Sequence, residues 1–499
     1  MSHFLSNSLA QVGEVRGIVK VDNAVQAYAV VSLSTNPLLA STTESDGSFV
    51  IESVPFGDYT ITATFVGFKE ESTFITLNQQ NPSIDLNFNL INNLNALNEV
   101  VITGTKTFKR QTNSPVIVNL INSQQLNDVQ ACNLSDGLKF QPGLRVENNC
   151  QTCNYTQLRM NGLAGGYSQI LVNGRPIFSP LTGLYGLEQL PTNMIDRIEV
   201  IRGGGSSLYG SSAIGGTVNV ITRIPKNNSY ELNSFYQNIN RGANDLVLSG
   251  NASIVSENRN SGVSFFFNRR QRDFYDHNED NFSELPELEN TSFGTNIFFL
   301  PSSNQKLEIS LSNLNEFRFG GEMVEKPAYL TQQAEERNQN VWMGSADYQI
   351  NFNDDNSSLI TYAAWQNTQR KHYTGVFPDE QEEVLSHIEN PPYGTSNTTT
   401  FQGGFQLNHK LYNFITGTNT LTLGSEYLLD DVFDEISTYN YLIDQTTTDF
   451  GTFMQSDWEL SPSLNLLSGI RMDKHNLIDD LVFSPRVSLL YKYKTNTQT

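Results

Sequence analysis

From about Asn227 onward, apolar and polar residues alternate along one long segment after another. In the stretch KLEISLSNL, Leu307, Ile309 and Leu311 would face one way and the residues between them the other. The segments TLTLGSEY and RVSLLYKYK repeat this two-residue period, which is that of a β-strand with two different faces. We count about twelve such strands, joined alternately by short turns and longer polar loops, as in an antiparallel transmembrane barrel.

The composition narrows the class of protein further. The chain has 31 Lys and Arg against 52 Asp and Glu, a formal net charge of −21, which argues against a nucleic-acid binder because such proteins need a basic face. No run approaches the roughly 18 apolar residues of a transmembrane helix, and the mean hydropathy is −0.35. A helical membrane protein is therefore excluded, whereas alternating barrel strands keep the mean hydropathy low.

The first part of the chain, residues 13–91, predicts a small β-sandwich. Short β-prone runs such as RGIVKV, GSFVIESV and GDYTITATFVGF are separated by turn signals, including Asp46-Gly47. Residues 1–12 precede it, and Ser8–Gln11 reads like the end of a signal peptide whose start is missing. We expect either such a remnant, with a gene model that begins late, or an ordinary tail.

An Asn-rich linker, residues 92–105, follows and contains the β-prone strip EVVITG. Such a strip can add to the sheet of a partner protein through main-chain hydrogen bonds. It can equally be the last strand of the preceding sandwich, and the residues alone leave both readings open.

The second domain, residues 106–225, mixes strands with a helix near Leu134–Phe140. Its most unusual stretch is RIEVIRGGGSSLYGSSAIGGTVNVIT, Arg197–Thr222. A nucleotide P-loop would need a lysine that is absent, and a dinucleotide fingerprint would need a helix directly after the glycines. No Ser-His-Asp set or His-Glu-x-x-His motif occurs either, so we expect no enzyme. Small residues instead permit close contact with another surface.

The motifs LRMNGL, ILVNGRPI, IDRIEVIRGGGSSLYGSSAIGGTVNVIT and the upstream EVVITGT resemble the plug domain and coupling box of TonB-dependent outer-membrane transporters. The TTESDGSFVIESVPFGDYTITATFVGF region resembles the carboxypeptidase-regulatory-like, transthyretin-like domains. The resemblance implies a mainly β fold: an Ig/transthyretin-like sandwich, a mixed α/β plug and, over residues 226–499, part of a barrel of twenty-two strands. About twelve strands are present, so the chain is expected to be C-terminally incomplete.

The resemblance assigns roles to residues in the second domain. TonB would grip the strip Glu99, Val100, Val101, Ile102, Thr103 and Gly104. Substrate would contact the plug apex at Asn149, Cys150, Cys153, Tyr155, Phe178 and Tyr185. The residues that would let the plug pack against the wall and slide are Arg159, Glu199, Arg202, Gly203, Gly204, Gly205, Gly210, Gly215 and Gly216. The three charged residues would pair inside the plug or with the wall, and a solvated plug surface is the alternative for them.

The three cysteines, Cys132, Cys150 and Cys153, all lie in this domain. A structural zinc site would need a second cysteine pair, and only Cys132 remains beside the Cys-x-x-Cys. In the oxidising cell envelope that the resemblance implies, we expect a Cys150–Cys153 disulfide, while a direct role toward a metal complex stays open. Cys132 is expected to be a small apolar filler.

The function expected from the resemblance is active transport across the outer membrane of a Gram-negative bacterium, with the N-terminal domain in the periplasm. The expected partners are TonB with its inner-membrane complex, the lipid bilayer and a small-molecule substrate, with a surface lipoprotein as a further candidate; no cofactor is expected. A ferric siderophore, haem, cobalamin or other metal complex is the favoured substrate, and a glycan or peptide importer or a non-transporting receptor or adhesin is the alternative. Acidic loops near His277, His372 and His387 would gather a cation or simply be solvated.

Overall fold

The computed structural model describes a large part of the chain, and that part divides into two units. The units are residues 1–100 with 110–112, and residues 101–109 with 113–499. The described residues are 12–21, 24–25, 29–33, 39–65, 71–90, 100–148, 156–176, 186–225, 227–494 and 497–498.

The first unit contains two β-sheets that enclose one hydrophobic core, which confirms the predicted sandwich. One sheet consists of β1 (Val12–Val21), β2 (Ala24–Val25), β5 (Ser48–Pro55) and β8 (Ser83–Leu90), with β8 parallel to β1. The other consists of β3 (Val30–Leu33), β4 (Ala40–Thr42), β6 (Gly57–Thr64) and β7 (Glu71–Leu77). Alternate residues such as Val31, Ile61 and Phe88 point inward, and Gly47 takes the positive φ of 78° that the turn requires.

The plug in the second unit has a five-stranded sheet in the order β11 (Val118–Asn122), β16 (Ile195–Arg202), β17 (Gly216–Thr222), β14 (Ser168–Val172) and β15 (Arg175–Pro176). A hairpin of β12 (Leu144–Asn148) and β13 (Thr156–Met160) accompanies it. The short elements are β9 (Val100–Val101), β10 (Lys109–Arg110), η1 (Gln111–Asn113), η2 (Gly165–Tyr167), η4 (Thr192–Met194), η5 (Ser211–Ala213), α2 (Ser123–Asp128), α3 (Leu134–Lys139) and α4 (Ser206–Tyr209). The predicted helix is α3, and the side chain of Asn133 caps it by accepting from the Asp136 amide.

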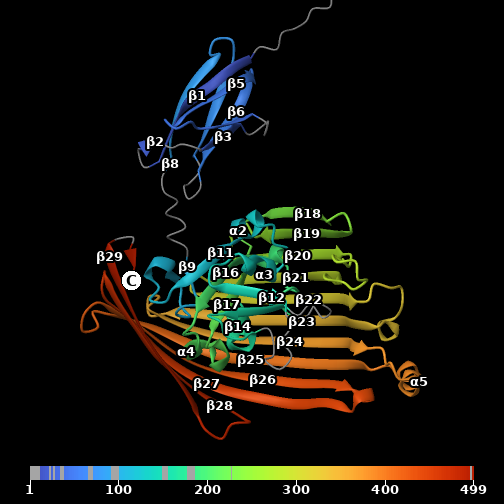
Figure 1. The fold of residues 1–499 in the computed structure, drawn as a ribbon. Helices are drawn as coiled ribbons and strands as arrows, with labels where there is room; N and C mark the ends of the chain where they lie inside the picture. The colour runs from blue at the N-terminus through green and yellow to red at the C-terminus, as the bar shows by residue number, and fades with distance from the viewer. Residues whose placement is uncertain are drawn as a thin grey trace, which may run out of the picture. The chain divides into compact units, whose positions relative to one another are not determined.

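The alternating segments form one antiparallel sheet in which each strand pairs with the next along the chain. Figure 1 shows this sheet, here called the wall, curving around the plug. Twelve long strands, the number expected, and a two-residue strand β30 are described in it. They are β18 (Ser229–Ile239), β19 (Ala243–Val255), β20 (Ser261–Arg272), β21 (Glu287–Ser302), β22 (Gln305–Gly321), β23 (Gln333–Phe352), β24 (Ser357–Val376), β25 (Tyr393–Tyr412), β26 (Thr418–Ile436), β27 (Tyr441–Ser461), β28 (Leu464–His475), β29 (Val482–Lys494) and β30 (Thr497–Gln498).

The wall has two distinct ends. At one end, here called the turn end, the strands are joined by tight connections such as Ser303–Asn304 and Pro462–Ser463. The other, the loop end, carries the longer segments 273–286 and 377–392, with α5 (Gln381–Glu389) in the second, and also η6 (Ala328–Leu330) and η7 (Ser437–Tyr439). Short turns on one side and long loops on the other are typical of outer-membrane barrels, whose short turns face the periplasm.

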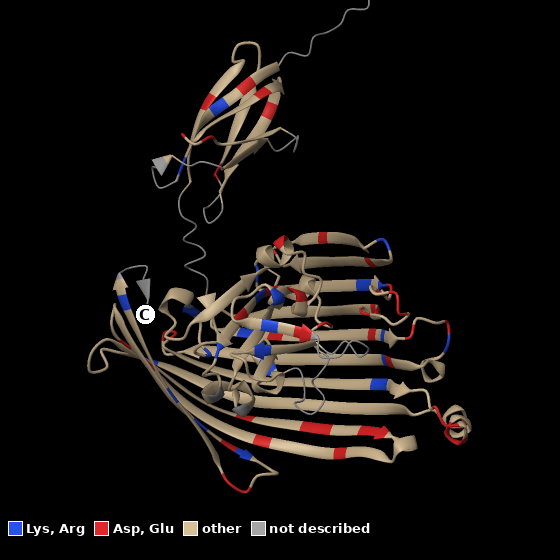
Figure 2. Ribbon diagram, viewed as in Figure 1, with Lys and Arg blue, Asp and Glu red and all other residues tan. Residues whose placement is uncertain are grey.

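The two faces of the wall differ in the sense expected for a sheet in lipid. On β26, Leu421 and Leu423 are exposed, whereas Glu426, Asp430 and Asp434, on the other face of the strand, are buried. Figure 2 shows acidic residues in red along several wall strands. An apolar outer face with a polar interior is the reverse of a soluble sandwich. Among the helices of the described residues, none has the length and apolar character needed to cross a membrane.

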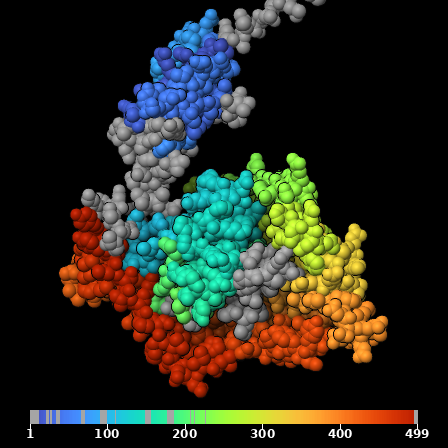
Figure 3. All heavy atoms as spheres, viewed as in Figure 1, coloured from blue at the N-terminus to red at the C-terminus, as the bar shows by residue number. Residues whose placement is uncertain are grey.

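The plug and the wall share one hydrophobic core. Plug residues such as Leu138 and Ile198 lie in the same cluster as Phe266, Leu314 and Val341 of the wall strands. Figure 3 shows the plug atoms against the concave side of the wall. The plug is therefore held by packing that spans several wall strands.

One local expectation needs correction. The sequence predicted no helix directly after Gly203–Gly205, but the amides of Leu208 and Tyr209 both donate to the Gly205 carbonyl and close the one-turn helix α4. His372 lies in strand β24, near the acidic segment 377–392, and its Nε2 is 3.0 Å from a carboxylate oxygen of Asp434.

Gly17 in β1 offers a direct test of the sandwich. A Cβ atom at Gly17 would lie 1.7 Å from the carbonyl oxygen of Leu86 in the parallel strand β8. We expect Gly17→Val to separate β1 from β8 and to destabilise this unit by more than about 3 kcal/mol. Limited proteolysis with increasing denaturant would measure it, and Glu52→Val at an exposed position of β5 is the control. Equal resistance of the two variants would contradict the strand pairing.

Candidate functional site

The strip expected to bind TonB begins at Glu99, which lies outside the described residues, and continues into a segment docked on the plug. We call residues 101–109 the leader. The side chain of Val101 is 1% exposed and packs with Val116, Val118, Ile201 and the wall residue Leu467. The strip is thus held in the hydrophobic interior rather than displayed.

The leader is anchored by Glu199, whose side chain is 0% exposed. Its Oε2 accepts hydrogen bonds from the Ile102 amide at 2.9 Å and from the Thr103 amide and hydroxyl at 2.8 and 2.7 Å. The Arg197 guanidinium donates to the other oxygen at 3.0 Å. Hydrogen bonds to a charged group contribute about 1.5–3 kcal/mol each, so these contacts fix the leader in place.

Thr103 is also held from its other sides. The Asn219 side-chain amide donates to the Thr103 hydroxyl at 2.9 Å, and the Tyr209 hydroxyl donates to the Thr103 carbonyl at 3.1 Å. Asn219 is a buried polar residue in the middle of the apolar strand β17. A buried amide needs partners, and here the leader supplies one.

Beyond Thr103, two lysines attach the leader to the wall. The ammonium of Lys106 lies 3.4 Å from Glu426 and 4.2 Å from the ring centroid of Phe453. The Lys109 ammonium contacts Asp457 and Glu459. Burial lowers the pKa of Lys106 to about 8, although the neighbouring Glu426 opposes this shift.

The two arginines expected to pair inside the plug or with the wall differ in their surroundings. Arg159 of β13 forms an ion pair with Glu147 on the neighbouring strand β12. Arg202, at the end of β16, is exposed and donates to the Pro142 carbonyl at 3.4 Å. Among the described residues, neither arginine forms an ion pair with the wall.

The glycines expected to face the wall serve mainly the internal geometry of the plug. They are Gly203, Gly204, Gly205, Gly210, Gly215 and Gly216. A Cβ atom at Gly216, whose φ is 149°, would lie 2.4 Å from the Ile201 carbonyl oxygen. Where the stretch meets the wall, the Arg471 guanidinium donates to the Leu208 carbonyl at 3.2 Å. This polar contact differs from the featureless sliding plate that the sequence suggested.

All six residues expected at the substrate-binding apex, with the expected disulfide, lie outside the described residues: Asn149, Cys150, Cys153, Tyr155, Phe178 and Tyr185. Close to these segments in the chain, Glu188 pairs with Arg318 of the wall and accepts from Thr156. Burial by itself would raise the pKa of Glu188, but the guanidinium groups of Arg318 and Arg272 outweigh it and lower the pKa to about 2.

The remaining sequence candidates lie at the loop end of the wall and just before α3. In the loop after β20, one carboxylate oxygen from each of Asp276, Asp280 and Glu284 lies within 4.8 Å of the others. His387 is buried in α5 and its Nε2 lies 2.8 Å from the Tyr329 carbonyl, away from that loop cluster. Cys132 is half-buried before α3, and burial raises the pKa of its thiol to about 11.

Several residues of this site were missed by sequence reasoning. Lys106 and Lys109 are the two cations of an otherwise uncharged leader, and Asn219 is the single polar interruption of VNVI. Both signals were readable, because an isolated polar residue in an apolar strand usually has a buried partner. Nothing in the sequence pointed to Glu426 or Arg471 as the partners.

Comparison with known proteins adds independent information. Residues 110–217 match the family model for the TonB-dependent Receptor Plug Domain, and residues 15–102 match the CarboxypepD_reg-like domain. An iron-regulated outer membrane virulence protein of Vibrio cholerae is 36% identical over 131 residues, and a vitamin B12 transporter BtuB of the same species is 31% identical over 124. Each match covers 25% of this chain and 20% of the relative.

Solved structures share the fold over a longer stretch. The siderophore receptor PirA from Acinetobacter baumannii matches with a TM-score of 0.64 at 17% identity, over 77% of this chain and 60% of that one. A mutant of the ferric enterobactin receptor PfeA from Pseudomonas aeruginosa gives 0.61 at 18% identity, over 76% and 60%. The chain therefore spans less than two thirds of the length of these proteins.

The anchoring role of Glu199 predicts a measurable change in backbone protection. In Glu199→Gln the acceptor of the two leader amides loses its charge, so we expect the amides of Ile102 and Thr103 to exchange at least about tenfold faster. Hydrogen–deuterium exchange of the receptor would measure this. Glu147→Gln, which alters an ion pair elsewhere in the plug, is the matched control, and equal exchange in both variants would contradict the anchor.

The lowered pKa of Lys106 predicts an unusual pH dependence. Between about pH 8 and 10.5, Lys106 is deprotonated in the folded protein but still protonated in the unfolded chain. The free energy of unfolding of the unaltered protein, measured relative to that of Lys106→Met, should therefore rise with pH over this range and then level off. Below pH 8 the lysine is charged in both states and the difference should be constant. Paired thermal melts of the two proteins would measure the trend, and a fall across this range would contradict it.

Proposed function

The chain belongs to the TonB-dependent receptors of the outer membrane, and we propose that it imports a scarce nutrient by drawing on TonB for energy. In this proposal the plug blocks the barrel until substrate binds at the loop end. TonB then grips the strip at residues 99–104, and the substrate passes to the periplasm. The receptor moves its substrate unchanged and performs no chemistry on it.

The observation that carries this proposal is the docking of the leader on Glu199. A short β-prone strip is tied to a buried carboxylate in the middle of the plug sheet, so a pull on the strip acts on the plug itself. An extended strip of this kind can pair with an edge strand of a partner protein. The contacts of Ile102, Thr103 and then Lys106 would break in sequence, each at modest cost, as the leader is drawn out.

Metal complexes or cobalamin are the substrates we favour. This choice is supported by the similar proteins, which include an iron-regulated outer membrane protein, a vitamin B12 transporter and siderophore receptors. The substrate would meet the wall loops and the apex segments 149–155 and 177–185. The sandwich would lie in the periplasm, where it precedes the leader in the chain.

Deletion of Val100–Thr103 tests the proposal. Because the deleted residues hold both the TonB grip and the Glu199 contacts, we expect uptake of the limiting nutrient to be lost while the receptor still reaches the outer membrane. Growth of a knockout strain on single iron, haem or cobalamin sources, complemented with each variant, would measure this. A deletion of Asn78–Asn81, an exposed turn of the sandwich, is the control of equal length. Unchanged uptake after the Val100–Thr103 deletion would exclude TonB-coupled import.

A further inference from the structure

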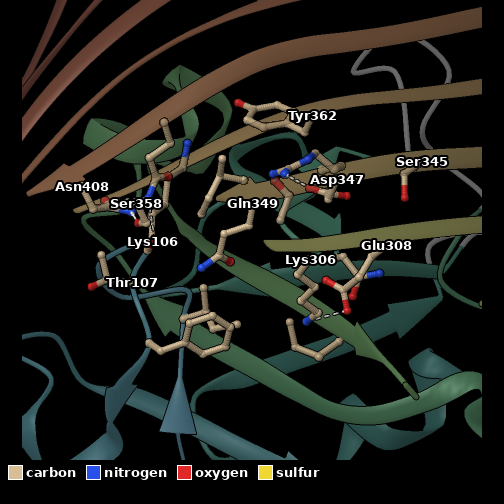
Figure 4. Close-up of a pocket in the computed structure, with 18 of the residues that line it drawn as sticks. Lys106, Thr107, Lys306, Glu308, Ser345, Asp347, Gln349, Ser358, Tyr362 and Asn408 are labelled. Carbon is tan, nitrogen blue, oxygen red and sulfur yellow. Dashed lines mark hydrogen bonds and ion pairs between the residues drawn. The ribbon is translucent and has the colours of Figure 1, made fainter. Parts of the chain in front are cut away.

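A cavity of about 430 Å³ lies between the plug and the wall at the turn end. The leader residues Ile102, Lys106 and Phe108 form part of its boundary, and strands from β21 to β26 form the opposite side. Figure 4 shows Ser345, Asp347 and Gln349 reaching it from the single wall strand β23. The lining combines polar side chains, such as Gln349 and Asn408, with apolar surface from residues such as Phe108 and Ile360.

Two smaller cavities continue from it toward the loop end. One of about 50 Å³ shares Arg175 and Ser345 with the large cavity, and one of about 60 Å³ shares Gly174 and Tyr209 with it. The two small cavities share Pro176 with each other. All three therefore meet at one plug segment, residues 173–176, which we call the Arg175 loop.

Arg175 closes this junction. Its guanidinium forms an ion pair with Asp347 of β23 and lies 3.5 Å from the ring centroid of Tyr362 on β24. The loop is a tight turn in which Asn173 and Gly174 both have positive φ, so it projects Arg175 toward the wall. A cation that is both paired and stacked on an aromatic ring bridges the space that would otherwise connect the cavities.

The same loop is connected to the leader through Asn219. The Asn219 side-chain oxygen accepts from the Gly174 amide at 2.8 Å, while its amide nitrogen donates to the Thr103 hydroxyl at 2.9 Å. Tyr209, which donates to the Thr103 carbonyl, borders two of the cavities. Withdrawal of the leader therefore takes a partner from Asn219, the residue that holds the Arg175 loop, and removes Ile102 and Lys106 from the boundary of the large cavity.

We propose that substrate crosses the receptor along the wall strands β22–β26, past the Arg175 loop, and that withdrawal of the leader releases this loop through Asn219. The proposal rests on TonB-coupled import and adds the route and its gate. The rest of the plug, including its contacts with β19 and β20, stays in place while the path opens.

Two inner-wall serines provide a matched test. Ser264, Asn296, Ser310 and Ser345 are register partners across β20 to β23, so Ser264 and Ser345 occupy equivalent register positions three strands apart. Ser345 borders the large and the 50 Å³ cavities, whereas Ser264 borders none of the three. Ser345→Cys and Ser264→Cys would each be made in the full receptor and exposed to a membrane-impermeant maleimide in energised cells.

We expect Ser345→Cys to be labelled several-fold faster when TonB is present than when it is absent. Ser264→Cys should be labelled at the same rate with and without TonB. The receptor without an added cysteine corrects for Cys132, Cys150 and Cys153. Equal acceleration at both positions would mean that the whole plug leaves the barrel, and would overturn the route. No acceleration at Ser345, in cells whose uptake still requires TonB, would overturn it while leaving import intact.

The gate is tested separately by Arg175→Gln. We expect this variant to raise labelling of Ser345→Cys even without TonB, because the bridge to Asp347 and Tyr362 is lost. Arg145→Gln, which alters an exposed arginine of the plug hairpin, is the control. Equal labelling in these two variants would exclude Arg175 as the gate, and this outcome does not depend on TonB.

Discussion

The buried carboxylate of Glu199 is the interaction on which the rest of the site depends. A charged group without water must be fully satisfied, and here the leader supplies three of its hydrogen bonds. The same requirement holds in reverse, because Ile102 and Thr103 leave a buried charge behind when they depart. The plug is thus stable with the leader in place and strained without it, which suits an element that is opened by pulling and recloses afterwards.

The ion pairs between plug and wall have opposite polarity at the turn end and at the loop end of the wall. Toward the turn end, the leader and plug supply cations, Lys106, Lys109 and Arg175, to carboxylates of the wall. Toward the loop end, the plug supplies the carboxylate of Glu188 to Arg318 of the wall. A plug displaced along the barrel axis would bring like charges together, so this arrangement favours one seating depth. Local release near the turn end is consistent with it, since the Glu188 contact is far from the leader.

Much of the architecture was readable from the sequence because it follows from local patterns. Strict alternation in segments such as KLEISLSNL fixes a two-faced strand, and Asp46-Gly47 fixes a turn through the backbone freedom of glycine. The helix α3 was expected near Leu134–Phe140, and Glu199 stood out as a charge on an apolar strand. The one-turn helix α4 was missed because four residues leave no periodic signal. The smooth contact with the wall expected of Gly203–Gly216 was not found either. A side chain at Gly216 would collide with the Ile201 carbonyl inside the plug, so this glycine is needed for the plug's own packing.

The sequence by itself determined the class of fold and the order of its parts, and it predicted a strip that a partner would grip, because each rests on residues close together in the chain. Tertiary structure alone decided what that strip is bound to and where space remains. In the chain, Thr103 lies 96 residues from Glu199 and 116 from Asn219, and Lys106 meets Glu426 320 residues away. Such pairs depend on the register of the plug sheet against the wall, and a register is set by the whole set of packed strands rather than by any one segment.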